Sequence, residues 1–114
     1  MAVLDYLELP VQSVAKAQEF YGAAFGGRFT GYGPDYAAHE GGPCQLGLNG
    51  AQDAERSAAI LPVIRVEDIE AARAAVLAAG GRLTLDIFAF PGGRRFHFAD
   101  PEGLELACYQ PEES

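Results

Sequence analysis

The side chains best suited by their surroundings to acid–base chemistry lie far apart in the sequence of this 114-residue chain. Glu8 is a carboxylate inside an alternating apolar segment, where it would serve as a general base or would bind a cationic or hydroxyl-bearing ligand. The alternative role is an internal ion pair with Arg65 or Arg94. The spacing of charges leaves both roles open, and Glu8 is the candidate catalytic residue.

The two histidines are the other groups suited to proton transfer or metal binding. His39 stands next to Glu40 in a turn-rich stretch, which is typical of a surface hairpin. His97 stands between two phenylalanines and therefore points away from both, into a cleft or toward solvent. No combination of these histidines with Glu8 and Glu105 has the spacing of a metal site or a catalytic triad.

Serine and cysteine offer little nucleophilic chemistry. Ser13 is expected to cap a helix, and the other serines, Ser57 and Ser114, lie in an expected linker and at the end of the sequence. Cys44 and Cys108 both lie in alternating apolar segments, so we expect two buried thiols, with a disulfide or redox pair as the alternative.

Composition narrows the function classes. Eight basic and sixteen acidic residues give a formal net charge of −8, which disfavours nucleic acid and anionic membranes as partners. No apolar run approaches the ~20 residues that span a bilayer, and the acidic start does not resemble a signal peptide. We expect one cytoplasmic domain over residues 1–114 with an ordinary hydrophobic core, 49% of its residues being hydrophobic.

The elements that must position these groups occur twice. A strand, a helix cap, a helical apolar pattern and a double glycine run from Leu9 to Gly27 and recur from Ile64 to Gly81. We interpret this as a duplication, with module one at about 1–49, a linker at about 50–58 and module two at about 59–114. The predicted strands are 3–11, 28–32, 36–40 and 44–49 in module one, and 59–66, 82–89, 94–99 and 104–109 in module two. Ser13 and either Glu67 or Asp68 are expected to cap the two helices.

Five phrases in this order resemble the vicinal oxygen chelate superfamily, which includes glyoxalase I, bleomycin-resistance proteins and extradiol dioxygenases. They are Tyr6-Leu7-Glu8-Leu9-Pro10-Val11, Phe20-Tyr21 with Phe25-Gly26, Val66-Glu67-Asp68-Ile69, Gly80-Gly81 and Asp100-Pro101-Glu102-Gly103. The resemblance implies an α+β fold of two βαβββ modules that form a curled mixed sheet around a cleft, usually completed in a homodimer.

In the catalytic members four His, Glu or Gln side chains from the opening and last strands bind a divalent ion. The resemblance carries these places onto Tyr6, Gln45, Leu61 and Ala107. Leucine and alanine cannot bind a metal, and a protonated phenol and one amide are poor ligands for a divalent cation. We therefore expect the family's metal, and any other cofactor, to be absent.

Period-2 alternation sends these four positions to the cleft side of the sheet. The candidate ligand-binding residues on that side are Tyr6, Glu8, Gln45, Leu61, His97, Ala107 and Tyr109. A cleft with aromatic groups, one acid and no metal suits a flat or amphipathic organic molecule.

The resulting hypothesis is a metal-free glyoxalase-like homodimer that sequesters or senses a small organic molecule, with its enzymatic status left open. One alternative is a metal-dependent lyase, isomerase or dioxygenase that uses an unorthodox set such as Glu8, His39 and His97. The other is an interaction module whose cleft is filled by its own side chains.

Overall fold

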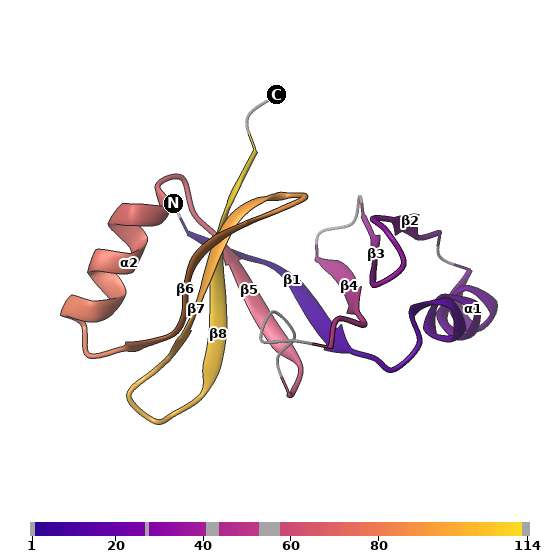
Figure 1. Ribbon diagram of the computed structural model, residues 1–114, viewed down its shortest axis with the longest axis horizontal. Helices are drawn as coiled ribbons and strands as arrows, with labels where there is room; N and C mark the ends of the chain where they lie inside the picture. The colour runs from indigo at the N-terminus through magenta and orange to yellow at the C-terminus, as the bar shows by residue number, and fades with distance from the viewer. Residues whose placement is uncertain (1, 27, 41–43, 53–57, 113–114) are drawn as a thin grey trace. The chain divides into compact units, whose positions relative to one another are not determined.

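The computed structural model describes residues 2–26, 28–40, 44–52 and 58–112. Its elements follow the order strand, helix, three strands, twice over (Figure 1). The described residues group into two compact units, which we call the first unit, within Tyr6–Leu61, and the second unit, within Met1–Asp5 together with Pro62–Ser114. The α+β class and the βαβββ duplication are confirmed.

The first unit contains a mixed sheet with the strand order β2-β3-β4-β1. β1 runs parallel to β4, whereas β2–β3 and β3–β4 are antiparallel. Its elements are β1 (Val3–Pro10), of which the unit holds the part from Tyr6 onward, α1 (Val14–Phe25), β2 (Thr30–Gly31), β3 (Tyr36–His39) and β4 (Gln45–Asn49).

Helix α1 begins and ends where the sequence predicts. The Lys16 N–H donates to the Ser13 hydroxyl at 3.2 Å, which satisfies one of the free donors of the first turn. Gly26 adopts a left-handed conformation with φ of 74° and donates its N–H to the Gly22 carbonyl at 2.8 Å. A side chain at position 26 would be strained there, which explains the glycine.

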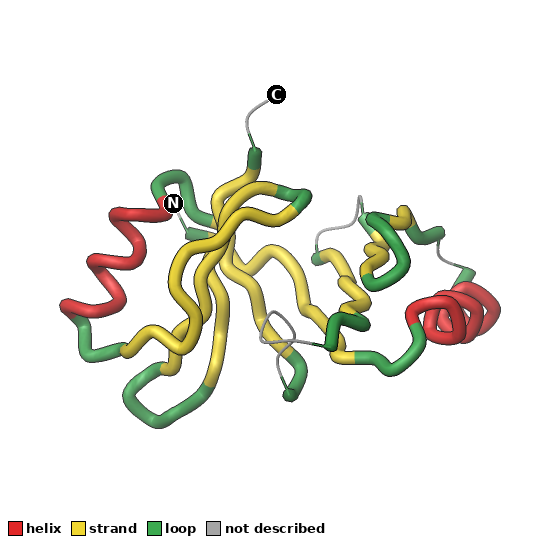
Figure 2. The backbone as a smooth tube through the Cα atoms, in the orientation of Figure 1, coloured by secondary structure: helices red, strands yellow, loops and turns green. Residues whose placement is uncertain are grey.

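The second unit repeats this plan with the strand order β5-β8-β7-β6. β5 and β8 are parallel, and β7 pairs antiparallel with both β8 and β6. Its elements are β5 (Leu61–Arg65), α2 (Ile69–Ala78), β6 (Arg82–Phe90), β7 (Gly93–Ala99) and β8 (Glu105–Pro111). Figure 2 distinguishes the helices, strands and loops of both units by colour.

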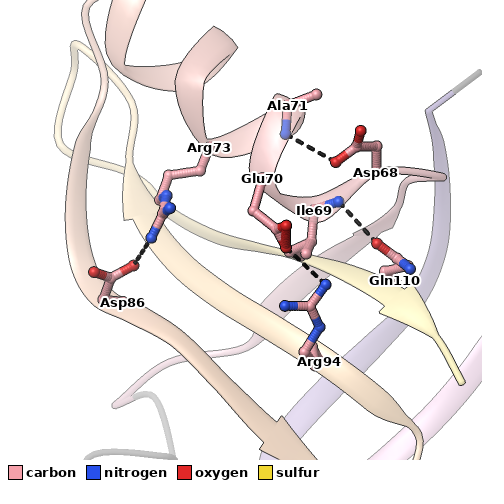
Figure 3. A network of polar contacts seen from close by, with 8 residues as sticks. All are labelled: Asp68, Ile69, Glu70, Ala71, Arg73, Asp86, Arg94 and Gln110. Atoms are coloured by element: carbon pink, nitrogen blue, oxygen red, sulfur yellow. Dashed lines mark hydrogen bonds and ion pairs between the residues drawn. The ribbon is translucent and has the colours of Figure 1, made fainter.

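Helix α2 is tied to this sheet at its N-terminus (Figure 3). Asp68, one of the two predicted caps, accepts from the Ala71 N–H at 3.1 Å, and the Gln110 side chain of β8 accepts from the Ile69 N–H at 2.9 Å. Two exposed ion pairs, Arg73–Asp86 at 2.8 Å and Arg94–Glu70 at 2.7 Å, join the helix to β6 and β7. Arg73 lowers the pKa of the Asp86 carboxyl by hydrogen bonding to it.

The core of the second unit lies between α2 and one face of its sheet. Ile69 packs there with Phe96, Phe98 and Cys108, and with the partly buried Ile64, Val66 and Leu106. These strand residues share the face of the sheet that packs against α2. The opposite face therefore carries the alternate residues of β7 and β8.

A turn at Asp100–Gly103 joins β7 to β8. The Asp100 carboxylate accepts from the N–H groups of Glu102 and Leu104, both at 2.9 Å. Gly103 has a φ of 89°, and its N–H donates to the Asp100 carbonyl at 2.9 Å. This carboxylate shapes the turn.

Several predicted features fall outside the described residues, namely Gly27, the Gly42–Pro43 break, Ser57 and Ser114. Within the described part of the chain, neither helix has the length and apolar character needed to cross a membrane.

The two cysteines differ in environment, and the prediction of two buried thiols is wrong for Cys44. Cys44 precedes β4 and is exposed, whereas Cys108 lies in the core of the second unit, and both are free. Burial raises the pKa of Cys108 to about 11, which keeps it as the unreactive thiol.

We therefore predict that a thiol reagent at pH 8 titrates Cys44 alone in the native protein and both cysteines in denaturant. The reason is that Cys108 is both shielded and protonated at that pH. Absorbance of the released chromophore gives the count, and Cys44→Ser serves as the control that removes the native signal. Fast native reaction in Cys44→Ser would contradict the placement of Cys108.

Candidate functional site

Glu8 is the most deeply buried acid among the described residues of the first unit. It lies in the middle of β1, opposite Gly47 of the parallel strand β4, and only 2% of its surface is exposed. Tyr6, on the same face, is buried, whereas Leu7 and Leu9 on the other face are only partly buried. The face that carries the polar candidates is thus the better shielded one along this strand.

Two neutral side chains of the first unit donate to the Glu8 carboxylate. The Tyr36 hydroxyl of β3 donates to Oε2 at 2.8 Å, and the Asn49 amide of β4 donates to Oε1 at 2.9 Å. Asn49 is 4% exposed. A buried carboxylate is costly unless hydrogen bonds replace its hydration, and each oxygen has such a bond here.

Strand pairing explains how side chains so distant in sequence meet. Tyr36 lies directly opposite Asn49 in the β3–β4 pair, and Glu8 lies opposite Gly47 in the β1–β4 pair. Residues paired across strands share one face of the sheet. Strand β4 therefore stands between the other two strands and brings Tyr36 and Asn49 to Glu8.

Gly47 leaves the space through which Tyr36 reaches Glu8. A Cβ at this position would collide with the Tyr36 hydroxyl and would lie 3.1 Å from Cζ of the same ring. Its contact with Cγ of Glu8 would be an ordinary 3.7 Å. The backbone of Gly47 is not left-handed, so its conformation does not require a glycine. The space occupied by the Tyr36 side chain does.

The places where the superfamily holds a metal do not fit one in this chain. Tyr6 and the half-buried Gln45 are paired in register, whereas Leu61 and Ala107 are fully buried hydrocarbon side chains. Two of the four places thus carry no donor atom, and the remaining phenol and amide are neutral. Among the residues that the structure describes, no three His, Cys, Asp or Glu side chains gather into a metal-binding group.

The predicted site residues of the second unit lie on the face opposite α2. His97 is paired with Ala107, which is paired in turn with Val63. His97 is 1% exposed, so its predicted alternative orientation toward solvent is wrong. Its Nδ1 lies 3.6 Å from a Glu105 oxygen that also accepts from Thr84 at 2.8 Å.

Tyr109 lies on this same face, and its hydroxyl donates to Asp5. Opposite Tyr109 in the β7–β8 pair is Arg95, which is 3% exposed. The guanidinium carbon lies 5.4 Å from the ring centre of Phe88 and 5.2 Å from that of Phe90, both within cation–π range. Irregular pairing in β6 sets Phe88 opposite Arg95.

His39 does not belong with Glu8. It is paired with Leu46 of β4, so it shares the face of Leu46, and its ring lies 5.9 Å from that of Phe29. Glu8 and Tyr36 lie on the other face. The unorthodox metal set of Glu8, His39 and His97 is therefore wrong as regards His39.

Three residues on these two faces were not predicted from the sequence. Tyr36, Asn49 and Arg95 are not among the predicted site residues, and the suggested ion-pair partners of Glu8 are Arg65 and Arg94 rather than Arg95. Arg94 is half-exposed and pairs with Glu70. Alternation offered a signal for Arg95, because it precedes Phe96 and so lies on the face of His97. No sequence signal indicated that Tyr36 and Asn49 meet at Glu8.

Comparison with known proteins agrees with the fold. The family model described as Glyoxalase/Bleomycin resistance protein/Dioxygenase superfamily matches residues 3–107. No curated protein matches the chain.

Solved structures with the same fold are similar over nearly the whole chain. A methylmalonyl-CoA epimerase from Mycobacterium tuberculosis is 17% identical, with a TM-score of 0.79, over 96% of this chain and 88% of that one. A hypothetical protein from Bacillus halodurans C-125 is 16% identical, with a TM-score of 0.79, over 99% and 96%. An NAD-dependent benzaldehyde dehydrogenase from Legionella pneumophila is 15% identical, with a TM-score of 0.78, over 94% and 98%. At such identities the likeness concerns the fold and not the reaction.

The close approach of the Tyr36 side chain to Gly47 predicts the effect of adding a methyl group at position 47. Gly47→Ala should destabilise the protein by about 1–3 kcal/mol, as overpacking in a filled site does. In a Tyr36→Phe background the cost should fall, because the colliding hydroxyl is gone. Denaturant melts of the four proteins measure this coupling.

Gly31→Ala is the matched control, because a Cβ on this strand glycine would meet nothing within 4 Å. Its effect should stay within about 0.5 kcal/mol. A Gly47→Ala cost that is equally small, or unchanged by Tyr36→Phe, would contradict the proposed clearance.

Proposed function

The chain belongs to the Glyoxalase/Bleomycin resistance protein/Dioxygenase superfamily, and from that premise we propose that it is a metal-free binder of a small organic molecule. The molecule lies in the sheet cleft of the fold and is sequestered or sensed rather than transformed. The site residues of this proposal in the first unit are Tyr6, Glu8 and Gln45. The two free thiols suit the reducing cytoplasm that the proposal assigns to the protein.

The observation that carries the proposal is the hydrogen-bonded Glu8. Burying a carboxylate to 2% exposure costs free energy, and an apolar residue at position 8 would avoid this desolvation cost. Glu8 has instead two dedicated donors, Tyr36 and Asn49, and a glycine that clears the path of one of them. Polar groups that are preorganised in this way are typical of ligand sites.

The donor set supports the absence of a metal from this function. Leu61 and Ala107 offer no lone pair, and His39 is turned to the other face of its sheet. Divalent ions of the kind used in this superfamily need several oxygen or imidazole ligands. The metal-dependent lyase, isomerase or dioxygenase is therefore the weaker alternative.

The interaction-module alternative has one observation in its favour. Leu61 and Ala107 are fully buried, and Tyr6, His97 and Tyr109 are at most 9% exposed. A cleft that is filled by the protein's own side chains would bury these residues to the same extent. Ligand binding that depends on Glu8 separates this alternative from the proposed function.

Glu8→Gln should leave stability within about 1 kcal/mol and weaken the binding of small aromatic or amphipathic compounds. The Gln amide oxygen can accept from Asn49, and the Tyr36 hydroxyl can turn to accept from its NH₂. Ligand-detected NMR and denaturant melts measure the two effects.

Glu8→Leu is the control for structural loss, since it strands both donors at about 1–3 kcal/mol each. A Glu8→Gln protein that unfolds as easily as Glu8→Leu while binding the same compounds would make Glu8 a structural residue.

Added Ni²⁺, Zn²⁺, Mn²⁺ or Fe²⁺ should give no stoichiometric site. A specifically bound ion raises the melting temperature in proportion to its occupancy, and two of the four family positions have no donor atom. Thermal melts of untagged protein with each ion, with and without EDTA, provide the test. Clear stabilisation by one ion at micromolar concentration, reversed by EDTA, would favour the metal-dependent enzyme.

A symmetric homodimer is part of the proposal. Leu61, Val63 and Ala107 give one face of β5 and β8 an apolar character that favours pairing with another sheet. We expect sedimentation at tens of micromolar to give about twice the 12.1 kDa mass of the chain. A monomer at that concentration would contradict this assembly.

A further inference from the structure

We propose that Tyr36 and Asn49 hold Glu8 as an ionised hydrogen-bond acceptor, and that they thereby make the site selective for ligands that present a donor, a protonated amine or a hydroxyl. Tyr36 and Asn49 are positioning residues in this account, and Glu8 is the group that contacts the ligand. The inference rests on the proposed function, because it names the ligand class of the same site.

The Asn49 amide is held in one orientation. The Ala51 backbone N–H donates to Oδ1 of Asn49 at 2.9 Å. A backbone N–H can only donate, so the oxygen end of the amide faces Ala51 and the NH₂ end faces Glu8. Asn49 is thus held by the turn after β4 as a donor to Oε1 of Glu8.

The other oxygen of the Glu8 carboxylate, Oε2, also accepts a hydrogen bond. The Tyr36 hydroxyl lies 2.8 Å from Oε2 and is held there by the β3–β4 pairing, with Gly47 leaving room for it. Hydrogen bonds donated to both oxygens favour the charged form of a carboxylic acid. The two donors thereby also fix the plane of the carboxylate.

The charge state of Glu8 determines which ligand groups can bind to it. An ionised carboxylate can only accept hydrogen bonds, so any group of a ligand that meets Glu8 must donate. A ligand carboxylate would instead bring a second negative charge to a site where Glu8 is 2% exposed and screening by water is weak. The site should therefore discriminate by the polar end of the ligand.

The experiment compares three probes with one ring and different polar ends: benzylammonium, benzyl alcohol and benzoate. Calorimetric titration gives the dissociation constants for the native protein and for Tyr36→Phe, Tyr32→Phe and Glu8→Gln. The readout is the ratio of the benzoate to the benzylammonium constant, which a merely structural loss of affinity would leave unchanged. Melting curves establish that each variant is folded.

We expect benzylammonium to bind about tenfold or more tightly than benzoate in the native protein, with benzyl alcohol between them. Tyr36→Phe should lower this ratio severalfold without changing the net charge. Glu8→Gln should bring the ratio close to one. Tyr32→Phe should not change it, although it too removes a phenol that donates to a glutamate, because Glu40 is exposed.

The outcomes separate the inference from the proposed function. Binding of benzoate as tight as that of benzylammonium, or an unchanged ratio in Tyr36→Phe, would overturn the donor selectivity and leave small-molecule binding intact. Binding of none of the three probes up to about 10 mM would count against the proposed function and the inference together.

Discussion

The burial of one carboxylate sets the conditions for the first unit. Glu8 has almost no contact with water, so its oxygens need donors from the protein itself. Three strands meet that need. β1 carries the acid, β4 supplies the Asn49 amide, and β3 supplies the Tyr36 hydroxyl. A one-residue shift of β3 against β4 would turn Tyr36 to the other face, and a shift of β1 against β4 would turn Glu8 away from both donors.

The same requirement explains residues that touch no ligand. Gly47 is small because the Tyr36 hydroxyl passes over it, and the Ala51 N–H sets the direction of the Asn49 amide. The second unit shows a related arrangement in which Arg95 is buried between two aromatic rings rather than beside water. In the second unit α2 covers an apolar face of the sheet, and the opposite face carries the buried Arg95 and His97.

Much of the fold could be predicted, because it follows from local patterns. Ser13, Asp68 and Gly26 mark helix ends by chemistry that acts within a few residues. Alternation placed His97 on the face opposite its two phenylalanine neighbours. The Glu8 cluster depends on strand register, which joins residues 28 and 41 positions apart. Cys44 was misplaced because alternation near a strand end does not show where the strand begins.

The central claim is that Glu8 is an ionised acceptor held by Tyr36 and Asn49. Its most direct test is the carboxyl ¹³C resonance of Glu8 in protein labelled at glutamate, assigned by its loss in Glu8→Gln. The account predicts the chemical shift of a carboxylate at neutral pH, with a change on Tyr36→Phe that Tyr32→Phe does not reproduce. The chemical shift of a protonated carboxyl at neutral pH would contradict it.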